Sequence, residues 1–327
     1  MNAPPTELID AIRRSSRPLI LGHVRPDADC LGSMFALAAA AAESGRVPSV
    51  YYRAEEVSQR LAFLCRLSPR CSATSDQLRS CDAILVLDAA QQDRAAVRPP
   101  LAELGMNGTP VINIDHHIGN TGFGTINWVA PRASSTSEMA YRLLLALEWR
   151  ISPEIATLLY AGIHTDTHGF SLPNTTASAL QVAGELVATG ARVADLCERL
   201  CRSQTRSEFD LERIIYDNVR VTADGCIAYS TATYEEITST GCTAADIDEQ
   251  VSIPRSLRGI RIAILFSEGR PNRIRMNFRG EGGTDVLELA REFGGGGHKE
   301  AAGAVVNGTM DEVVTTVLAR AGEILRR

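Results

Sequence analysis

A short apolar run that ends in three polar residues, PVINIDHH at residues 110–117, is the most informative part of this sequence. Two other segments have the same form, PLILGHV at residues 18–24 and DAILVLDAA at residues 82–90. Between such runs lie helical patterns, of which the alanine-rich LGSMFALAAAAAESG at residues 31–45 is the clearest. This alternation predicts an α/β fold with a parallel sheet and helices packed against it.

Polar side chains follow each of the three apolar runs. In open α/β sheets, ligands bind outside the carboxyl ends of the strands, so we expect these side chains to converge in space. A further aspartate, Asp166, ends a helical pattern that begins near residue 152. The residues after the strands are His23, Asp27, Asp29, Asp88, Asp115, His116 and His117.

The length of 327 residues suggests two domains by the usual domain size of roughly 100–200 residues. We expect a first domain over residues 1–195, a helical linker over residues 196–218 and a smaller C-terminal α/β domain over residues 219–327. Strand patterns such as IRIAILFS and RIRMNFRG and a final helical pattern support the second domain. The active site is expected in the cleft between the two domains.

Charge and hydropathy exclude several classes of protein. The formal net charge of −6 argues against binding of long duplex nucleic acid, which depends on many Lys and Arg contacts to phosphate. No apolar run reaches the roughly 18 residues that a membrane span requires. The N-terminus lacks an apolar core behind a basic start, so we expect no secretory signal and a cytoplasmic protein.

Histidine and carboxylate side chains are the ligands that Mn²⁺, Fe²⁺, Co²⁺ or Mg²⁺ accept, in contrast to a thiolate-rich zinc site. For Asp27 and Asp29 alone, the sequence leaves two interpretations open, because aspartate also caps the beginning of a helix. Several carboxylates at one edge of a sheet would repel one another strongly without cations. Two divalent cations, about 3.5–4 Å apart, would remove this repulsion and hold both oxygens of a phosphoryl transfer.

The motifs resemble those of the DHH phosphoesterase superfamily, which is named after the triplet found here as Asp115-His116-His117. The chain contains five motifs in the same order as in the family: GHVRPDAD, VLDAA, NIDHH, SSTSE and GIHTDT. FGGGGHKEAAGA at residues 293–304 is similar to the glycine-rich signature of the domain associated with this superfamily in RecJ-like enzymes and small-oligonucleotide phosphodiesterases. Within the superfamily, the chain is most similar to the bacterial oligoribonuclease and pAp phosphatase group.

The resemblance implies that two cations, which we expect to be Mn²⁺ with Mg²⁺ or Co²⁺ as alternatives, share Asp88 as a bridging ligand. It also implies that His117 is a proton donor or orienting group beside the scissile phosphate, and that Asp115 fixes the imidazoles. A homodimer is compatible with the resemblance. The implied metal ligands are His23, Asp27 and Asp88 for one cation, and Asp29, Asp88, His116 and Asp166 for the other.

The tetraglycine segment has two interpretations from composition and context. It could be a flexible linker, or its backbone N–H groups could approach a phosphate closely. Likewise, Arg279 could be a solvated strand residue, although its planar guanidinium suits phosphate. The resemblance favours substrate binding by Arg279, Gly295, Gly296, Gly297 and His298.

One motif departs from the family pattern. The family usually has TDTG followed by an aromatic residue and an arginine, whereas residues 165–176 read TDTHGFSLPNTT. His168 replaces the glycine and Ser171 lies near the position of the arginine. This change leaves open how that side of the pocket holds substrate.

We expect hydrolysis of short oligoribonucleotides, of linear dinucleotides such as pApA, or of 3′-phosphoadenosine 5′-phosphate (pAp). The alternatives are an inorganic pyrophosphatase, a RecJ-like single-strand exonuclease and a non-catalytic nucleotide sensor. The acidic chain and its length favour a small substrate.

Overall fold

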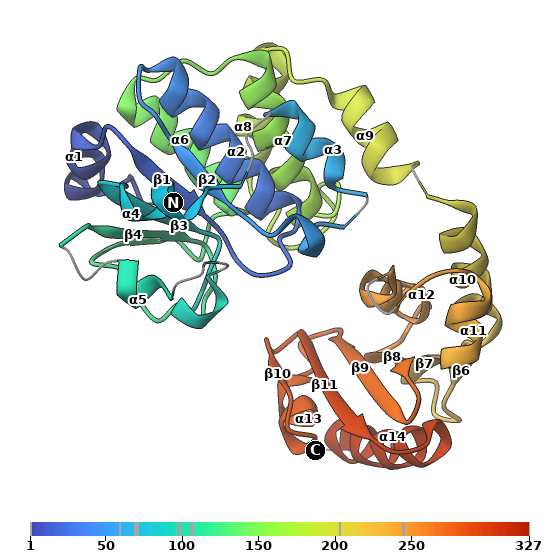
Figure 1. The fold of residues 1–327 in the computed structure, drawn as a ribbon. Coiled ribbons are helices and arrows are strands. Elements are labelled where there is room, and N and C mark those ends of the chain that lie inside the picture. The colour runs from blue at the N-terminus through green and yellow to red at the C-terminus, as the bar shows by residue number, and fades with distance from the viewer. Residues whose placement is uncertain are drawn as a thin grey trace. The chain divides into compact units, whose positions relative to one another are not determined.

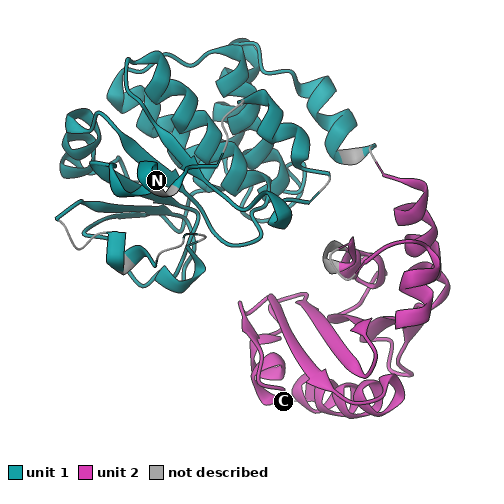
Figure 2. Cartoon of the chain, viewed as in Figure 1, with its two compact units in different colours: residues 1–203 teal, residues 204–327 magenta. Residues whose placement is uncertain are grey.

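In a computed structural model, the chain divides into two compact units, Met1–Ser203 and Gln204–Arg327 (Figure 2). Each unit has its own sheet and its own hydrophobic core. The structure describes residues 2–58, 60–68, 72–95, 97, 100–104, 108–202, 204–243 and 246–326.

Unit 1 contains a five-stranded sheet with the order β2-β1-β3-β4-β5, in which every neighbouring pair is parallel (Figure 1). The predicted parallel α/β fold is therefore confirmed. The fifth strand, β5, has no polar cluster at its end and was not recognised in the sequence. The strands are β1 (Pro18–Leu21), β2 (Ser49–Tyr51), β3 (Ala83–Leu87), β4 (Val111–Asp115) and β5 (Ile126–Val129).

Helices cover both faces of this sheet. Successive side chains of a strand point to opposite faces, so Ile20 packs in the cluster that contains α2, α6 and α7. Leu19 and Leu21 pack instead with Leu78 of α4 and Leu101 of α5. β1 and β3 read as continuous apolar runs because neither face of these strands is in water. The helices are α1 (Thr6–Arg14), α2 (Ala28–Glu43), α3 (Ala62–Leu67), α4 (Ser75–Arg79), α5 (Leu101–Leu104), α6 (Thr136–Leu147), α7 (Pro153–Asp166), α8 (Ala177–Ala188) and α9 (Val193–Cys201).

Helices α2 and α7 cross closely because each has a glycine at the contact. A Cβ atom on Gly32 would lie 2.4 Å from the carbonyl oxygen of Leu158. A Cβ atom on Gly162 would lie 2.4 Å from Oδ1 of Asp29 and 2.0 Å from Oγ of Ser137. The crossing therefore brings α7 against the beginning of α2 and α6 at a distance that no larger residue permits.

Asp82, just before β3, stabilises the beginning of β1. The N–H groups of Ser16 and Arg17 donate to its carboxylate at 2.8 and 3.0 Å. Although partial burial acts to raise the pKa of Asp82, the hydrogen bonds from Ser15, Ser16 and Arg17 hold it below its ordinary value. The Asp82 carboxylate therefore stabilises the folded state fully at pH values above about 4, the pKa of aspartate in the unfolded chain. This stabilisation is lost as the pH falls through the lower pKa that Asp82 has in the folded protein.

We expect Asp82→Asn to lower the free energy of unfolding by about 1 kcal/mol at pH 7, because an amide is a weaker acceptor than a carboxylate. The difference from wild type should shrink as the pH is lowered toward 3. Urea unfolding at several pH values measures both effects. Asp76→Asn is the control, because the Asp76 side chain is 95% exposed; a difference for Asp82→Asn that is constant with pH would contradict the prediction.

Unit 2 has a six-stranded mixed sheet with the order β10-β11-β9-β8-β7-β6. Only β7 and β8 are parallel, and the other neighbouring pairs are antiparallel. Its elements are β6 (Arg220–Val221), β7 (Ile227–Ala232), β8 (Ile262–Arg270), β9 (Arg273–Gly280), β10 (Gly296–Gly297), β11 (Ala301–Asn307), α10 (Arg206–Asp217), α11 (Tyr234–Ser239), α12 (Ser252–Arg255), α13 (Leu287–Glu292) and α14 (Met310–Arg326).

The segment expected as a linker, residues 196–218, contains the end of α9 in unit 1 and all of α10 in unit 2. Helix α10 begins with a capping box, in which Thr205 and Glu208 satisfy each other's backbone N–H groups. Among the described residues, none of the helices has the length and apolar character needed to cross a membrane.

Candidate metal centre

The candidate centre lies where the strand order of unit 1 reverses. After β1 the chain passes through α2 to β2 on one side, whereas β3 pairs with the other side of β1. The carboxyl ends of β1 and β3 are thus a topological switch point, where open α/β sheets bind ligands. His23 follows β1 and Asp88 follows β3, and His23 Nε2 lies 3.5 Å from Asp88 Oδ2.

Asp88 is the central residue of the cluster. It is 3% exposed, and its two carboxylate oxygens face different histidines. Oδ2 is near His23, whereas Oδ1 lies 3.5 Å from His116 Nε2 and accepts a hydrogen bond from Thr136 Oγ1 at 3.0 Å. The backbone of Asp88 is left-handed, with φ of 57°, a conformation that aspartate and asparagine tolerate better than most residues.

Asp27 caps α2 and also faces the cluster, so the two interpretations of this residue are compatible. Its Oδ1 accepts hydrogen bonds from the N–H groups of Asp29 and Cys30 at 3.0 and 2.9 Å. Its Oδ2 lies 3.8 Å from His23 Nε2. One carboxylate oxygen thus holds the helix, and the other remains directed at the candidate centre.

Asp29 is fully buried and caps a different helix from the one on which it lies. It accepts hydrogen bonds from the N–H groups of Thr136 and Ser137, at 2.6 and 2.8 Å, where α6 begins. The N-terminus of a helix stabilises negative charge. Burial nevertheless raises the pKa of Asp29 well above its ordinary value, and the charges of Asp88 and Asp27 act in the same direction.

Asp166 occupies an unfavourable position for a carboxylate, at the C-terminal end of α7, where the helix dipole is negative. Burial and the nearby charges of Asp29, Asp27 and Asp88 raise its pKa well above the ordinary value. Its Oδ2 lies 3.2 Å from His116 Nε2. A cation at this position would offset both the dipole and the repulsion among the carboxylates.

Asp115 and Asn120 orient His117. Asp115 Oδ1 lies 2.7 Å from His117 Nδ1, and Asn120 Nδ2 donates to Asp115 Oδ2 at 2.6 Å. Burial opposes the charged form of His117, but Asp115 and Asp88 raise its pKa above the ordinary value. The pKa of Asp115 is lowered, because the contacts from His117 and Asn120 outweigh burial. His117 therefore has its Nδ1 fixed by Asp115 and its charged form favoured.

The donor atoms fit divalent cations. Within each of three groups, one possible ligand atom per residue lies within 4.8 Å of the others. The donors are mainly carboxylate oxygen and imidazole nitrogen, which suit hard to borderline cations, and Cys30 adds a buried sulfur beside His23. The groups are His23, Cys30 and Asp88; Asp88, His116 and His117; and Asp29, His116 and Asp166.

The second half of the tetraglycine segment, residues 294–297, forms the short strand β10. Gly296 pairs with Gly303 and Gly297 with Ala302 in an antiparallel ladder, so the interpretation as a flexible linker is wrong. A Cβ atom on Gly297 would lie 2.5 Å from the carbonyl oxygen of Ala301, which explains the need for glycine there. At Gly296, by contrast, a Cβ atom would meet nothing within 4 Å.

Arg279 and His298 are brought near each other by the same sheet. Arg279 on β9 is opposite Ala301 on β11, and the N–H of His298 donates to the carbonyl of Ala301 at 2.7 Å. The side chain of Arg279 donates to the carbonyl of Phe278 at 3.0 Å. Both candidate substrate contacts therefore lie at one end of β9 and β11, beside the tetraglycine strand.

The altered segment after Asp166 is a tight turn. His168, Gly169 and Phe170 are consecutive residues with positive φ of 48°, 65° and 65°. The ring of Phe170 packs edge-on against His164, with 6.1 Å between centroids. The hydroxyl of Ser171 donates to the carbonyl of His168 within the turn. His164 therefore belongs to an aromatic cluster and does not join the candidate ligands.

Three residues that position the centre were not recognised from the sequence. Asn120 lies five residues beyond the start of the DHH triplet and is isolated from any motif. Thr136 lies within SSTSE, but its bond to Asp88 depends on the tertiary fold. Gly162 carried the best signal, because a glycine inside an apolar helical pattern often marks a close packing contact.

A doubly covered parallel sheet with a His/Asp cluster at its switch point, followed by a smaller mixed-sheet unit, has the topology and the donor atoms of an α/β enzyme that can hold divalent cations. The sequence matches the DHH family, N-terminal domain, over residues 17–163 and the DHHA1 domain over residues 224–327. The chain thus belongs to the DHH family of phosphoesterases, and the resemblance inferred from its motifs is confirmed.

Relatives match along nearly the whole chain. The bifunctional oligoribonuclease and PAP phosphatase NrnA of Bacillus subtilis (strain 168) is 31% identical over 307 residues, which cover 92% of this chain and 93% of that protein. An exopolyphosphatase-related protein from Bacteroides fragilis has a similar structure, with a TM-score of 0.89 and 25% identity over 98% of this chain and 97% of the other. RecJ from Thermus thermophilus, in complex with Mn²⁺, has a TM-score of 0.55 and 16% identity, over 98% of this chain and 54% of that chain.

Proposed function

We propose that this chain hydrolyses short oligoribonucleotides, including linear dinucleotides such as pApA, to mononucleotides, and removes the 3′-phosphate of pAp. The observation that carries the proposal is the position of Asp88 between His23 and His116 at the ends of neighbouring strands. Similarity to NrnA over more than nine-tenths of both chains supports the substrate class. The pyrophosphatase, long-strand exonuclease and sensor alternatives are not favoured.

The residues that would hold the cations divide around Asp88. We assign His23, Asp27 and Asp88 to one cation. For the other we assign Asp29, Asp88, His116 and Asp166. Divalent cations in such a site stabilise charge on phosphoryl oxygens and lower the pKa of bound water. We propose Mn²⁺ as the physiological metal, since imidazole nitrogen and carboxylate oxygen together suit a cation of this kind.

His117 is proposed as the proton donor or orienting group for the scissile phosphate. Its Nδ1 is held by Asp115, which leaves Nε2 as the atom that can reach a substrate. The raised pKa of His117 favours the protonated ring, which can donate to a phosphate oxygen or to the leaving group. Asp115 acts through this ring and is a positioning residue.

The direct test of the proposed function compares the rates at which a series of substrates is hydrolysed. Protein treated with EDTA and then loaded with Mn²⁺ is assayed against RNA of two to about 25 nucleotides, pAp and pyrophosphate. We expect release of mononucleotides from the shortest RNAs and phosphate from pAp, with much slower cleavage of long strands and no activity before Mn²⁺ is added. Fastest turnover of pyrophosphate, or of the longest RNA, would refute this assignment.

In unit 2, we propose that Arg279, Gly295, Gly296, Gly297 and His298 contact the substrate. The open space beside Gly296 and the closeness of Arg279 to His298 along the sheet support this assignment. We expect Arg279→Ala to raise the KM for pApA about tenfold, because one charge-assisted hydrogen bond to phosphate is worth about 1.5–3 kcal/mol, partly screened by water.

The kcat of Arg279→Ala should change much less than its KM, since the candidate metal ligands are untouched. Arg273→Ala is the matched control, because Arg273 lies on the same strand at its other end. An unchanged KM in Arg279→Ala, or an equal increase in both variants, would show that Arg279 is only a solvated strand residue.

We place the protein in the cytoplasm and propose that it forms a homodimer. The proposal of a dimer follows from the resemblance of the motifs to the DHH superfamily. Light scattering at several concentrations measures the mass in solution, and a monomer of 35.2 kDa at all concentrations would exclude the dimer.

A further inference from the structure

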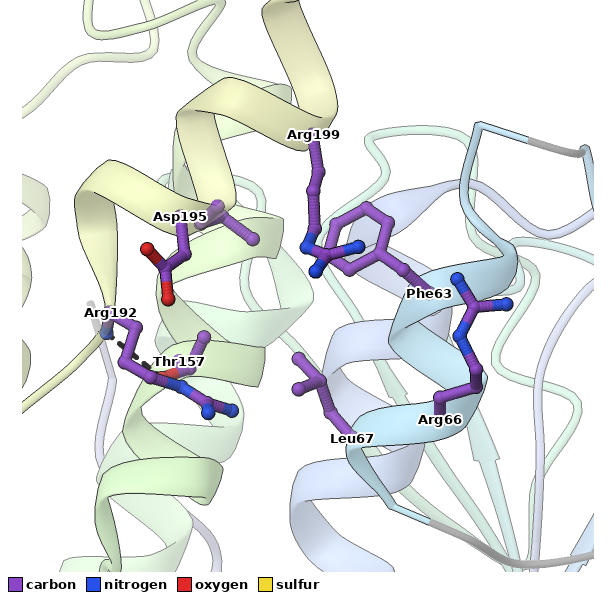
Figure 3. A pocket seen from close by; sticks show the side chains of 8 residues that line it. Phe63, Arg66, Leu67, Thr157, Arg192, Asp195 and Arg199 are labelled. Atoms are coloured by element: carbon purple, nitrogen blue, oxygen red, sulfur yellow. Dashed lines mark hydrogen bonds between the residues drawn. The ribbon is translucent and has the colours of Figure 1, made fainter. Parts of the chain in front are cut away.

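A cavity of about 120 Å³ lies in unit 1, lined by residues of α3, α7 and α9 and by the residue that precedes α9 (Figure 3). None of the candidate metal ligands lines it. Sites that enclose drug-sized ligands usually measure roughly 300–1,000 Å³, so a nucleotide bound to these lining residues would lie partly outside the enclosed space.

Three arginines give the cavity its charge. Arg66 comes from α3, Arg192 precedes α9, and Arg199 lies within α9. Asp195 is the one carboxylate among the lining residues that the structure describes. These four charged residues, which we call the rim, therefore have a positive net charge, in a protein whose net charge is −6. Arginine's planar fork is suited to binding phosphate through two parallel hydrogen bonds.

Three of the lining residues are apolar, and we call them the apolar floor: Phe63, Leu67 and Leu196. Phe63 and Leu196 are 6% and 1% exposed, and Leu67 is half-buried beside them. The guanidinium of Arg199 lies over the ring of Phe63, 5.6 Å from its centroid, and Figure 3 shows it reaching from α9 toward this ring. An apolar floor beside guanidinium groups suits a ligand with a flat ring and an anionic group.

Contacts with the rest of unit 1 hold the α9 side of the cavity in place. The N–H of Arg192 donates to Thr157 Oγ1 at 3.0 Å, and the Thr157 hydroxyl donates to the carbonyl of Pro153 at 2.7 Å. At the other end of α9, Arg60 Nε donates to the carbonyl of Leu200 at 2.7 Å. These hydrogen bonds fix the position of α9, and a lining that is held in place loses less conformational entropy when a ligand binds.

We propose that this cavity is a second ligand site, which binds a nucleoside monophosphate with its phosphate between Arg192 and Arg199 and its base against Phe63 and Leu67. The phosphate monoester dianion matches the guanidinium groups, and the base matches the apolar floor. The site is outside the metal centre and does not depend on hydrolysis by the chain.

The test is isothermal titration of AMP, inorganic phosphate and adenosine into the full-length protein in EDTA, which removes metal-dependent binding at the catalytic centre. We expect AMP to bind at least tenfold more tightly than either fragment. The double variant Arg192→Ala/Arg199→Ala should weaken AMP binding at least tenfold. Arg150→Ala, which changes an exposed arginine of the same unit outside the cavity, should leave the affinity unchanged.

A second variant separates loss of the site from damage to the fold. Asp195→Asn removes the negative charge from the rim, so we expect severalfold tighter AMP binding, a gain that misfolding does not produce. Equal AMP affinity in wild type and the double variant, or adenosine binding as tightly as AMP, would overturn the proposal. Equal affinities for phosphate and AMP would overturn the placement of the base on the apolar floor.

Discussion

Asp88→Asn is expected to reduce Mn²⁺-dependent hydrolysis of pApA by at least about 10³-fold. Removing a single group that stabilises transition-state charge typically costs roughly 10²–10³ in kcat, and Asp88 is assigned to both cations. Asparagine is the informative replacement, because it fits the left-handed backbone at φ of 57° and can still accept the hydrogen bond from Thr136. Loss of activity then reports loss of the carboxylate charge.

Two further measurements complete this experiment. Titration with Mn²⁺ should show weaker binding of both cations, and thermal unfolding in EDTA should show that the fold is retained. Asp93→Asn is the matched control, because Asp93 is an exposed aspartate a few residues farther along the chain. Turnover by Asp88→Asn within tenfold of wild type would refute the assignment of Asp88 as a shared ligand.

Gly162→Ala should have the second largest effect, although residue 162 is not a candidate ligand. The new Cβ would lie 2.4 Å from Asp29 Oδ1 and 2.0 Å from Ser137 Oγ, so the carboxylate must move. Overpacking of this kind costs about 1–3 kcal/mol of stability, and disturbing a group that orients a ligand costs roughly 10–100-fold in metal affinity or activity. We therefore expect both losses together.

Gly184→Ala is the control for this substitution. Gly184 lies within α8, and a Cβ atom there would meet nothing within 4 Å. Alanine is the better helix former, so this variant should be more stable than wild type by about 0.5–1 kcal/mol, with unchanged Mn²⁺ affinity. Equal behaviour of the two variants in unfolding and Mn²⁺ titration would contradict the role given to the α2–α7 crossing.

The parallel sheet and the convergence of polar residues could be predicted from the sequence because both follow from local patterns. PLIL, AILVL and VINID are apolar runs of strand length, and the polar residues directly after them must lie at the same edge of a parallel sheet. β5 was missed because its segment, INWV, is short and only partly apolar.

The positions of individual atoms around the centre could not be predicted in this way. Asp29 accepts from Thr136 and Ser137, more than 100 residues later in the chain, and only the packing of α2 beside α6 brings these groups together. Similarly, the short strand that Gly296 and Gly297 form depends on pairing with Gly303 and Ala302, which glycine composition does not predict.

The capping of α6 by Asp29 has a thermodynamic consequence for the whole of unit 1. The same buried carboxylate anchors a core helix and faces the other acidic groups of the centre. The charge state of the centre and the packing of α6 are therefore thermodynamically coupled. A ligand that binds only the folded state adds about 2.7 kcal/mol of stability at 100 times its Kd. Divalent cations bound at this centre would thus raise the free energy of unfolding of unit 1 as well as support turnover.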